Sequence, residues 1–538
     1  MSQKLQMRLV EAVTKPLREQ GLKGYRFRKL SIKCSQLPES MFKRIKNFFS
    51  TENILVSVGL IAAFVIRVFR IDQTLGFYYD QGRDASVIWD LIYKGKLFLI
   101  GPTTGLPGVF RGPYYYYLIA PFYWLGNGNP IWPYVFLTFT TVLAIALIYY
   151  LGKKIQDRTT GVIAAVIAAF SFNIFLASRW LSNPTPMLLL SLILVWGMIK
   201  VTEGKRWTWS IIATVAGLSL FSFGSSGEFF YLPALAIFLV WQWKNRPNLK
   251  NLVLSIFLFI LTFAPLVLFD LRHQNILLNN LFGTFGVGSG SFGVPTLDFI
   301  KSRTAAYFGI FTNKIFQSSS NLNSIVLVIT GISFLAFLPK LFKNSKTKII
   351  LLLLGSAVLG LYFYRGNYGI LYDYYMTGYY LIFILLFAIV LGQIWKYRIG
   401  KIFIAVFFIL FFMNNIPHIR GRMNDECNVS ESICLLNQKQ AIDWIYEDAG
   451  NRDFNVDVYV PPVIPYAYNY LFTWLGTTKY EKMPQDNQIP LLYTLYEVDP
   501  PHPERLQAWI DRQKGIGNII KEEKFGGIVV QERQRIKK

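Results

Sequence analysis

Long apolar segments alternate with short basic ones along most of this chain. A helix needs about 20 predominantly apolar residues to cross a bilayer. We therefore predict a polytopic α-helical membrane protein with about 11 transmembrane helices. The predicted spans are 53–70, 131–151, 159–177, 184–202, 207–224, 229–243, 250–270, 323–340, 347–364, 375–395 and 400–417.

The apolar segment Tyr114–Leu125 is the ambiguous one, because it is short, opens with four tyrosines and contains Pro121. Aromatic residues favour the membrane interface, so we predict a helix lying in the membrane surface. If this segment is not counted as a transmembrane span, five basic loops fall on the same side of the membrane. These loops carry Lys153, Lys154, Arg158, Lys200, Lys205, Arg206, Lys244, Arg246, Lys250, Lys340, Lys343, Lys346, Lys348, Lys396, Arg398 and Lys401.

We predict that this side is cytoplasmic, since basic loops are retained inside. The tail 1–52 falls on the same side and carries twelve basic and four acidic residues. It lacks the apolar run of a signal peptide and is typical of a basic arm near anionic lipid headgroups. An odd number of spans then places the segment after residue 417 outside the cytoplasmic membrane.

Composition agrees with this arrangement. The chain is 53% hydrophobic, 17% aromatic and 16% charged, against about 25% charged residues in soluble domains. This excludes a soluble globular or disordered chain. The net charge of +24 does not indicate a nucleic-acid partner, because the basic residues lie between apolar segments rather than on a polar domain.

Residues 418–538 contain no span, and their 15 basic and 17 acidic residues nearly balance. We predict a small extracytoplasmic α/β domain with strands Val456–Val460 and Gly527–Gln531 and helices Gln438–Ala449 and Pro503–Lys514, each helix ending before a glycine. The stretches PPVIPY and LYTLYEVDPPHP are turn-rich, and either contact the site or serve only the fold. Cys427 and Cys434 form either a local disulfide or two free thiols.

Acidic residues collect on the predicted outer face of the transmembrane domain 53–417. Loop 71–130 carries four of them, and the long loop 271–322 contains the glycine-rich GVGSGSFG, a candidate lid. The outer acidic residues are Asp72, Asp80, Asp84, Asp90, Glu228, Asp270, Asp298 and Asp373.

The sharpest local motif is FYYDQGRDA, residues 77–85. Asp80, Arg83 and Asp84 are spaced to share one face of a helix. One interpretation is a plain helix N-terminus with a local ion pair. The other is a site in which Arg83, with Arg111 before the tyrosine helix and Arg272 after the seventh span, binds a phosphate while a carboxylate serves as base.

These motifs resemble the GT-C glycosyltransferases, within them the protein O-mannosyltransferase and aminoarabinose-transferase branch. The resemblance places Asp80 at the catalytic aspartate, Arg83 at an arginine of the same motif and Arg111 at a basic phosphate ligand. Gly152-Lys153-Lys154 matches the glycine and basic pair that follow the second span in this family. Ser178-Arg179-Trp180, before the fourth span, also resembles the family. The architecture is matched over about residues 50–420, and the motifs only over about 77–185.

Gln81 replaces the second acid of the family motif. A metal held between two acids is one option in this superfamily, and Gln81 removes one of the two. His273 is a candidate metal ligand or a plain surface histidine, and no second clear ligand accompanies it. The sequence therefore predicts no certain cofactor.

The expected reaction is transfer of a sugar from a polyprenyl-phosphate donor to an acceptor hydroxyl or amine at the outer face. Asp80 acts as general base in an inverting displacement, and Arg83, Arg111 and Arg272 stabilise the phosphate. A double displacement would need a second carboxylate, for which Asp84 is the candidate. Gln81, Tyr79, Arg365 and Asp373 are secondary site candidates, and the acceptor is a lipid, polysaccharide or protein.

Three alternatives stay open. A secondary transporter would need ionisable groups inside its spans and repeat symmetry, and neither is evident. A non-catalytic glycan-binding scaffold would use the same aromatic outer face. A GT-C enzyme that transfers oligosaccharide or teichoic-type units would keep the fold and change only the substrate.

Overall fold

The computed structural model describes residues 51–105, 108–285, 292–318, 320–366, 369–424, 427, 431–461 and 464–536. The chain divides into two compact units, 1–62 and 63–538. The prediction for the tail 1–50 and most of the GVGSGSFG segment lie outside the described residues.

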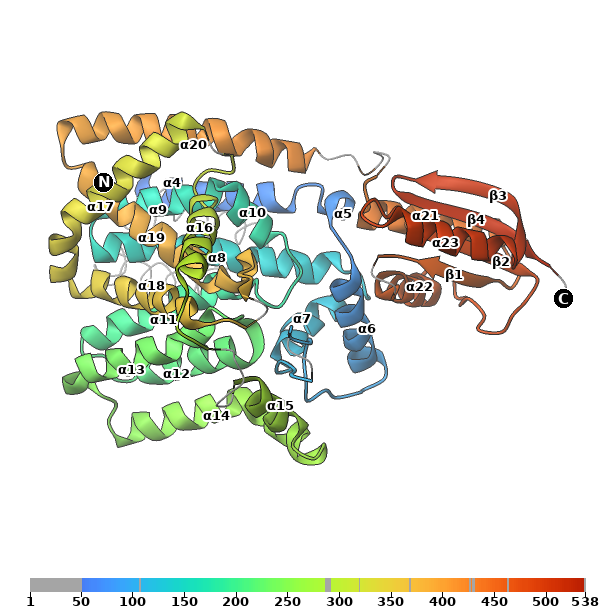
Figure 1. Ribbon diagram of the computed structural model, residues 1–538, viewed down its shortest axis with the longest axis horizontal. Coiled ribbons are helices and arrows are strands. Elements are labelled where there is room, and N and C mark those ends of the chain that lie inside the picture. The colour runs from blue at the N-terminus through green and yellow to red at the C-terminus, as the bar shows by residue number, and fades with distance from the viewer. Residues whose placement is uncertain are drawn as a thin grey trace, which may run out of the picture. The chain divides into compact units, whose positions relative to one another are not determined.

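Helices occupy every predicted span (Figure 1). Among the described residues, six are long and apolar enough to cross a membrane, and a seventh span is obtained if α9 and α10, bent by 66° at Ser171, count together. Four shorter apolar helices fill the other predicted spans, so the membrane class is confirmed and the number eleven stays a prediction. The helices are α4 (Thr51–Val68), α8 (Ile131–Ile155), α9 (Arg158–Phe170), α10 (Phe172–Ser178), α11 (Met187–Thr202), α12 (Thr208–Leu218), α13 (Tyr231–Trp241), α14 (Leu249–Arg272), α17 (Asn321–Lys343), α18 (Ser345–Phe363), α19 (Thr377–Ile394) and α20 (Arg398–Met423), with short turns η1 (Ser219–Phe223), η2 (Glu228–Phe230), η3 (Trp243–Asn245) and η5 (Asp373–Met376).

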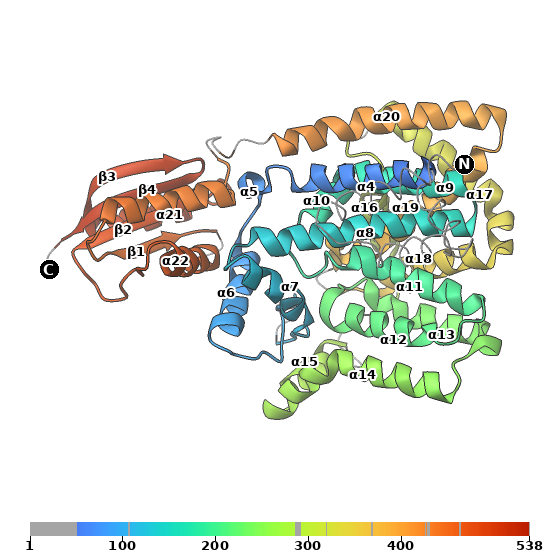
Figure 2. The ribbon, with the colours of Figure 1, turned by 180° about the vertical axis from the view of Figure 1, so that it is seen from behind.

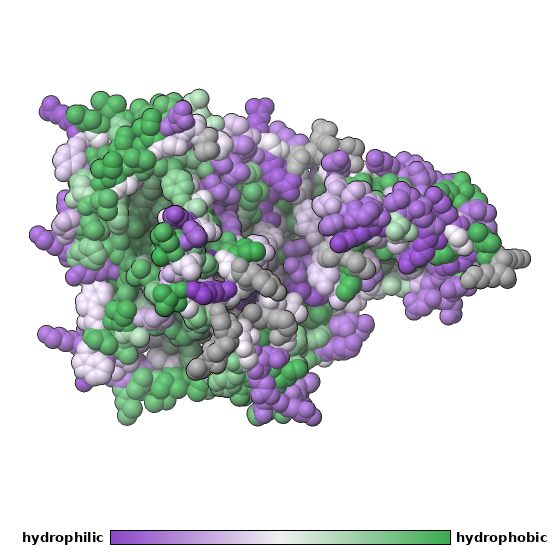
Figure 3. All heavy atoms as spheres, in the orientation of Figure 1, coloured by the Kyte–Doolittle hydropathy of each residue, from purple (hydrophilic) through white to green (hydrophobic). Residues whose placement is uncertain are grey.

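The core of this region is α19, which is apolar on all sides and buried along almost its whole length. In contrast, α14 buries only Ser255 and Thr262 and exposes leucine, valine and phenylalanine side chains. An exposed apolar surface of this kind suits contact with lipid. Figure 3 shows apolar residues gathered over the helical region and polar residues over the C-terminal part.

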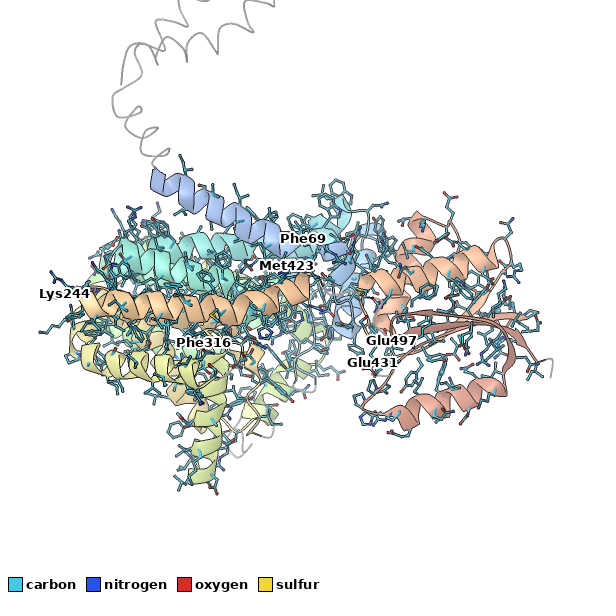
Figure 4. All side chains as sticks on the ribbon, turned by 90° about the horizontal axis from the view of Figure 1, so that it is seen from above. Phe69, Lys244, Phe316, Met423, Glu431 and Glu497 are labelled. Atoms are coloured by element: carbon cyan, nitrogen blue, oxygen red, sulfur yellow. A yellow bond between two sulfur atoms is a disulfide. The ribbon has the colours of Figure 1, made fainter. Side chains whose placement is uncertain are left out.

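The five basic loops meet at one end of the helical region. Glu203 lies 3.1 Å from the amino groups of both Lys154 and Lys200, and Lys396 lies 3.6 Å from Asp157. Lys244 lies at the end of the helical region away from the C-terminal domain (Figure 4). The contacts fit the predicted grouping of the loops on one face, whose assignment to the cytoplasm stays a prediction.

The outer loop 71–130 folds into α5 (Ile71–Thr74), α6 (Tyr79–Tyr93) and α7 (Tyr114–Leu125), and α7 has the predicted bounds. Its 12 residues extend only about 18 Å, which is less than the apolar thickness of a bilayer of about 30 Å. The predicted long loop 271–322 contains two helices, α15 (Ile276–Phe285) and α16 (Leu297–Thr312).

The C-terminal part contains a four-stranded sheet in the order β1-β2-β4-β3. β1 (Asn455–Tyr459) pairs in parallel with β2 (Leu491–Glu497), while β4 (Ile528–Arg535) pairs antiparallel with both β2 and β3 (Gly517–Phe525). In the register, Val456 faces Tyr493 and Leu495 faces Val530. The helices are α21 (Leu435–Ala449), α22 (Tyr466–Thr478) and α23 (Pro503–Lys514).

Several predictions for this part need correction. The first half of LYTLYEVDPPHP is the buried strand β2, because its alternating leucine, tyrosine and threonine residues suit a sheet. The helix at the last predicted span, α20, continues through Pro417 to Met423. Cys427 and Cys434 form a disulfide just before α21, which resolves that open alternative.

Candidate active site

The first turn of α6 brings Asp80, Arg83 and Asp84 together, as their spacing predicts. The Arg83 guanidinium lies 2.9 Å from the Asp80 carboxylate and 2.8 Å from that of Asp84. The Asp80 side chain is 63% exposed, whereas Asp84 is buried and accepts a hydrogen bond of 3.1 Å from the Tyr116 hydroxyl. One arginine therefore links an accessible carboxylate to an inaccessible one.

Burial separates the two carboxylates electrostatically. It raises the pKa of Asp84 to about 6, although Arg83 and Tyr116 oppose the shift. Burial also lowers the pKa of Arg83, but Asp84 and Asp80 outweigh it and hold that pKa above its ordinary value. Arg83 consequently stays charged. Asp84 is its buried ion-pair partner and is not exposed to a substrate.

Asp80 lines the polar part of a cavity of about 750 Å³. Arg111, Asp270, Asn183 and Ser225 line the same cavity. Its other walls are apolar and largely aromatic, including Phe110, Leu220, Phe221, Phe229, Phe230, Phe263, Leu266, Val267, Leu277, Leu278, Leu281 and Phe292. Such a cavity suits a ligand with a long apolar part and a charged or polar head.

Arg111 is held at the cavity by the turn that follows η1. Its guanidinium donates to the carbonyl oxygen of Gly224, and the backbone N–H of Gly112 donates to Phe221 at 2.6 Å. Burial lowers the pKa of Arg111, and the nearby Glu228 opposes this effect. Among the described residues, the buried Ser225 hydroxyl beside it has no hydrogen-bond partner.

Glu228 is a site residue that the sequence motifs did not single out. Its side chain is fully buried and accepts hydrogen bonds from the backbone N–H groups of Ser225 at 2.6 Å and Gly378 at 2.7 Å. It therefore shapes the turn that carries Ser225 and supplies a negative charge near Arg111. The only sequence signal was an acidic residue at the start of an apolar segment.

Gln81 and Tyr79 have structural partners. The Gln81 side chain accepts from the backbone N–H of Tyr78 at 3.2 Å and donates to the carbonyl of Leu181 at 3.1 Å, which fixes the start of α6. The Tyr79 ring packs against Tyr466 of α22, with centroids 4.8 Å apart. The position of the missing second acid is thus occupied by a helix cap.

Arg272 and His273 lie at the end of α14, where both are exposed and neither lines the cavity. The His273 ring stacks on Phe269, with centroids 4.0 Å apart. In the described part of the chain, no group of three or more histidine, cysteine, aspartate or glutamate residues is arranged to hold a metal ion. Asp270, two residues before Arg272, does line the cavity.

Arg365 and Asp373 also lie outside the cavity lining. Arg365 donates to the carbonyl of Val294, and Asp373 pairs with the buried Lys314 at 2.8 Å. The tyrosine-rich segment contributes instead through Tyr364, Tyr374 and Tyr375, which line the cavity.

The two sequence matches outside loop 71–130 lie in different places. Lys153 and Lys154 belong to the basic end, where Lys154 pairs with Glu203. Arg179 is mostly buried and donates to the Thr74 hydroxyl, and Trp180 lines the cavity.

The C-terminal domain holds both ends of the loop that carries α6. The N–H of Leu435 donates to Leu75 at 2.9 Å, and the Gln438 amide donates to Phe77 at 2.9 Å. At the far end of the loop, the Trp474 indole donates to Asn127 at 2.9 Å. Figure 2 shows α6 and α7 beside the C-terminal sheet region.

Comparisons with known proteins agree with this architecture. Residues 110–269 match the family described as dolichyl-phosphate-mannose-protein mannosyltransferase. The structure of ArnT from Cupriavidus metallidurans bound to undecaprenyl phosphate aligns with a TM-score of 0.55 at 10% identity, over 89% of this chain and 97% of that chain. Together these matches show that the chain has the fold of the ArnT structure and contains a segment similar to this mannosyltransferase family.

Two further structures match this chain. ArnT in the apo state aligns with a TM-score of 0.52 at 10% identity, over 90% of this chain and 98% of that one. The archaeal oligosaccharyltransferase AglB from Archaeoglobus fulgidus aligns with a TM-score of 0.47 at 10% identity, over 87% and 73% of the respective chains. No curated protein sequence matches the chain. The structural matches show a shared fold, and the apolar helices of the described residues suit an integral membrane protein.

Proposed function

We propose that this protein transfers a sugar from a polyprenyl-phosphate donor to an acceptor hydroxyl or amine at the extracytoplasmic face of the cytoplasmic membrane. The observation that carries the proposal is the position of Asp80 at the polar part of a large aromatic cavity that also contains Arg111. The apolar walls suit a polyprenyl chain, and the buried guanidinium suits its phosphate. The undecaprenyl phosphate named for one structural relative is a ligand of this class.

The proposed reaction is a single displacement. The acceptor oxygen attacks the anomeric carbon, the bond from that carbon to the phosphate oxygen breaks, and polyprenyl phosphate leaves with the electron pair. Asp80 removes the acceptor proton, and Arg111 stabilises the charge that develops on the phosphate. Displacement in one step inverts the anomeric configuration.

Arg83 has a positioning role in this proposal. Its guanidinium is already shared between Asp80 and Asp84, so it holds the base in place. Asp84 is buried against Arg83 and Tyr116, which leaves it poorly placed to act as a second nucleophile. Arg272, Arg365 and Asp373 have no assigned role, since none of them lines the cavity.

The test is sugar transfer from a panel of radiolabelled polyprenyl-phosphate sugars by the purified protein in lipid. We expect Asp80→Asn to reduce transfer by at least about 10³-fold, because loss of the base and of its negative charge both act on the transition state. Asp90→Asn is the matched control, since Asp90 lies on the same helix but pairs with Lys94 and Lys96 away from the cavity lining.

Two outcomes would contradict the proposal. Near-normal transfer by Asp80→Asn would remove Asp80 from catalysis. Binding of labelled donor without any transfer would favour a glycan-binding protein, and movement of intact donor across the membrane would favour a transporter. The anomeric configuration of the product, read by NMR, tests the single displacement.

A further inference from the structure

A second, smaller cavity lies on the other side of Tyr79 from the large one. It has a volume of about 30 Å³ and lies between the first residues of α6 and the start of α22. Three tyrosines line it, Tyr78, Tyr79 and Tyr466, together with two buried polar side chains, Gln438 and Glu497, and five apolar residues of the segment 460–467. Figure 4 shows Glu497 at the end of the sheet that faces the helical region.

The two buried polar groups have unused capacity to accept hydrogen bonds. Gln438 is fully buried, and its amide nitrogen donates to Phe77 at 2.9 Å, but its Oε1 atom has no partner within the described residues. Glu497 is 7% exposed and accepts from the Tyr468 hydroxyl at 2.8 Å. Within the described ranges no lysine, arginine or histidine forms an ion pair with Glu497.

A buried carboxylate without a cationic partner is costly. Burial raises the pKa of Glu497 to about 7, while hydrogen bonds from Tyr468 and Gln438 partly oppose the shift. A group that donates hydrogen bonds and carries positive charge would relieve this cost. The tyrosine rings favour the same kind of ligand, because the faces of aromatic rings attract cations.

The size of the small cavity limits which chemical groups it can bind. A volume of about 30 Å³ accepts one group of about the size of a water molecule. A primary ammonium fits, because it offers three hydrogen-bond donors and no acceptor. A whole sugar ring or a quaternary ammonium is too large.

The position of the cavity connects it to the reaction. Tyr79 lines the small cavity, and the next residue, Asp80, lines the large one, so their Cα atoms are about 3.8 Å apart. A molecule anchored in the small cavity would therefore lie beside the turn of α6 that carries Asp80.

We propose that the small cavity is an acceptor subsite that binds a primary ammonium group of the acceptor between Tyr79, Tyr466 and Glu497. The assignment of the bound molecule as an acceptor rests on the proposed function, whereas the binding of an ammonium group does not. A protonated amine has no free lone pair, so it anchors the acceptor while a separate hydroxyl reacts at Asp80.

The binding test uses methylammonium as the probe, with full-length protein in lipid nanodiscs and saturation-transfer NMR at pH 8, where Glu497 is ionised. We expect methylammonium to bind, and methanol and tetramethylammonium, which lack the charge or the small size, to fail. Glu497→Gln should weaken binding at least about tenfold, because a charge-assisted hydrogen bond is lost. Glu523→Gln, an exposed change in the same domain, should bind as the wild type does.

Wild-type protein that binds no methylammonium, or that binds tetramethylammonium equally well, would overturn the site, and the cavity would then hold only water. Unchanged binding by Glu497→Gln would overturn it as well. Tyr466→Leu provides a second variant that keeps the carboxylate and removes one ring, and we expect threefold to tenfold weaker binding.

Transfer assays separate this proposal from the proposed function. We compare kcat/KM for an amine-bearing acceptor with kcat/KM for its N-acetylated form. The amine should have the higher value, and Glu497→Gln should reduce the ratio of the two values about tenfold. Asp80→Asn should bind methylammonium as the wild type does. A protein without transferase activity that still binds methylammonium through Glu497 would contradict only the proposed function.

Discussion

Gly82 of α6 lies directly against the backbone of Ala467 in α22, so that a Cβ atom at position 82 would come within 2.3 Å of the Ala467 nitrogen. The neighbouring atom is backbone, which cannot move aside as a side chain can. This close approach fixes the helix that carries Asp80 against the C-terminal domain.

We expect Gly82→Ala to destabilise the protein by about 1–3 kcal/mol through overpacking, even though alanine is the better helix former. The displaced α6 should also lower sugar transfer. Thermal unfolding and the transfer assay measure the two effects. Gly355→Ala, within α18 and with open space around it, should be neutral or slightly stabilising. Wild-type stability and activity of Gly82→Ala would show that this contact is loose.

Arg111, the half-buried arginine of the cavity, should be far more important than the exposed Arg272. We expect Arg111→Ala to reduce kcat/KM for the donor about 10²- to 10³-fold, because its guanidinium is desolvated and faces the proposed phosphate. Arg272→Ala should change kcat/KM less than about twofold, since Arg272 is exposed and does not line the cavity. A large effect of Arg272→Ala with little effect of Arg111→Ala would reverse the assignment of the phosphate ligand.

Glu497 should make stability depend on pH. Its pKa is raised from the ordinary 4.5 to about 7 in the folded protein, so the folded state binds more protons than the unfolded state between these values. The free energy of unfolding should therefore fall as pH rises from 4.5 to 7, by about 3 kcal/mol at most. Thermal unfolding at several pH values measures this slope. Glu497→Gln should reduce this dependence of stability on pH. An equal slope in both proteins would contradict the raised pKa of Glu497.

The three cysteines of the chain allow a direct test of orientation. Cys427 and Cys434 form a disulfide, a bond typical of oxidising compartments, and Cys34 lies in the basic tail that we predict to be cytoplasmic. On intact cells, an impermeant maleimide should label the protein only after impermeant reductant opens the disulfide. Permeabilised cells should label Cys34. Labelling of Cys34 on intact cells would invert the topology.

Much of the fold could be predicted, because the decisive signals are local. Spans are visible as apolar segments, and α7 follows from a short aromatic run between glycine-containing turns. The sheet order β1-β2-β4-β3 could not be derived, since β2 pairs with β1 and β4, each separated from it by an intervening helix. Helix α22 was missed because its tyrosine-rich sequence follows the proline-rich PPVIPY, which masks the helical pattern.

Some contacts of the candidate site could likewise be predicted from the sequence, and others could not. Asp80, Arg83 and Asp84 meet through helical spacing alone, so their contact could be predicted. The bond from Arg111 to Gly224 joins residues 113 apart, and the roles of Glu228 and Gln438 depend on similarly distant partners. The contacts of Arg365 with Val294 and of Asp373 with Lys314 likewise do not follow from their place in an aromatic outer segment.

The contacts of α21 and α22 with residues 75–82 and 127–128 also impose an order on assembly. The loop that carries Asp80 is synthesised early, but the groups that hold it, including Gln438 and Trp474, are synthesised more than 300 residues later. A partly made chain therefore has its apolar helices in the membrane without a fixed catalytic turn. Under the proposed function, sugar transfer begins only when α21 and α22 have folded onto this loop, so that unfinished copies do not consume donor.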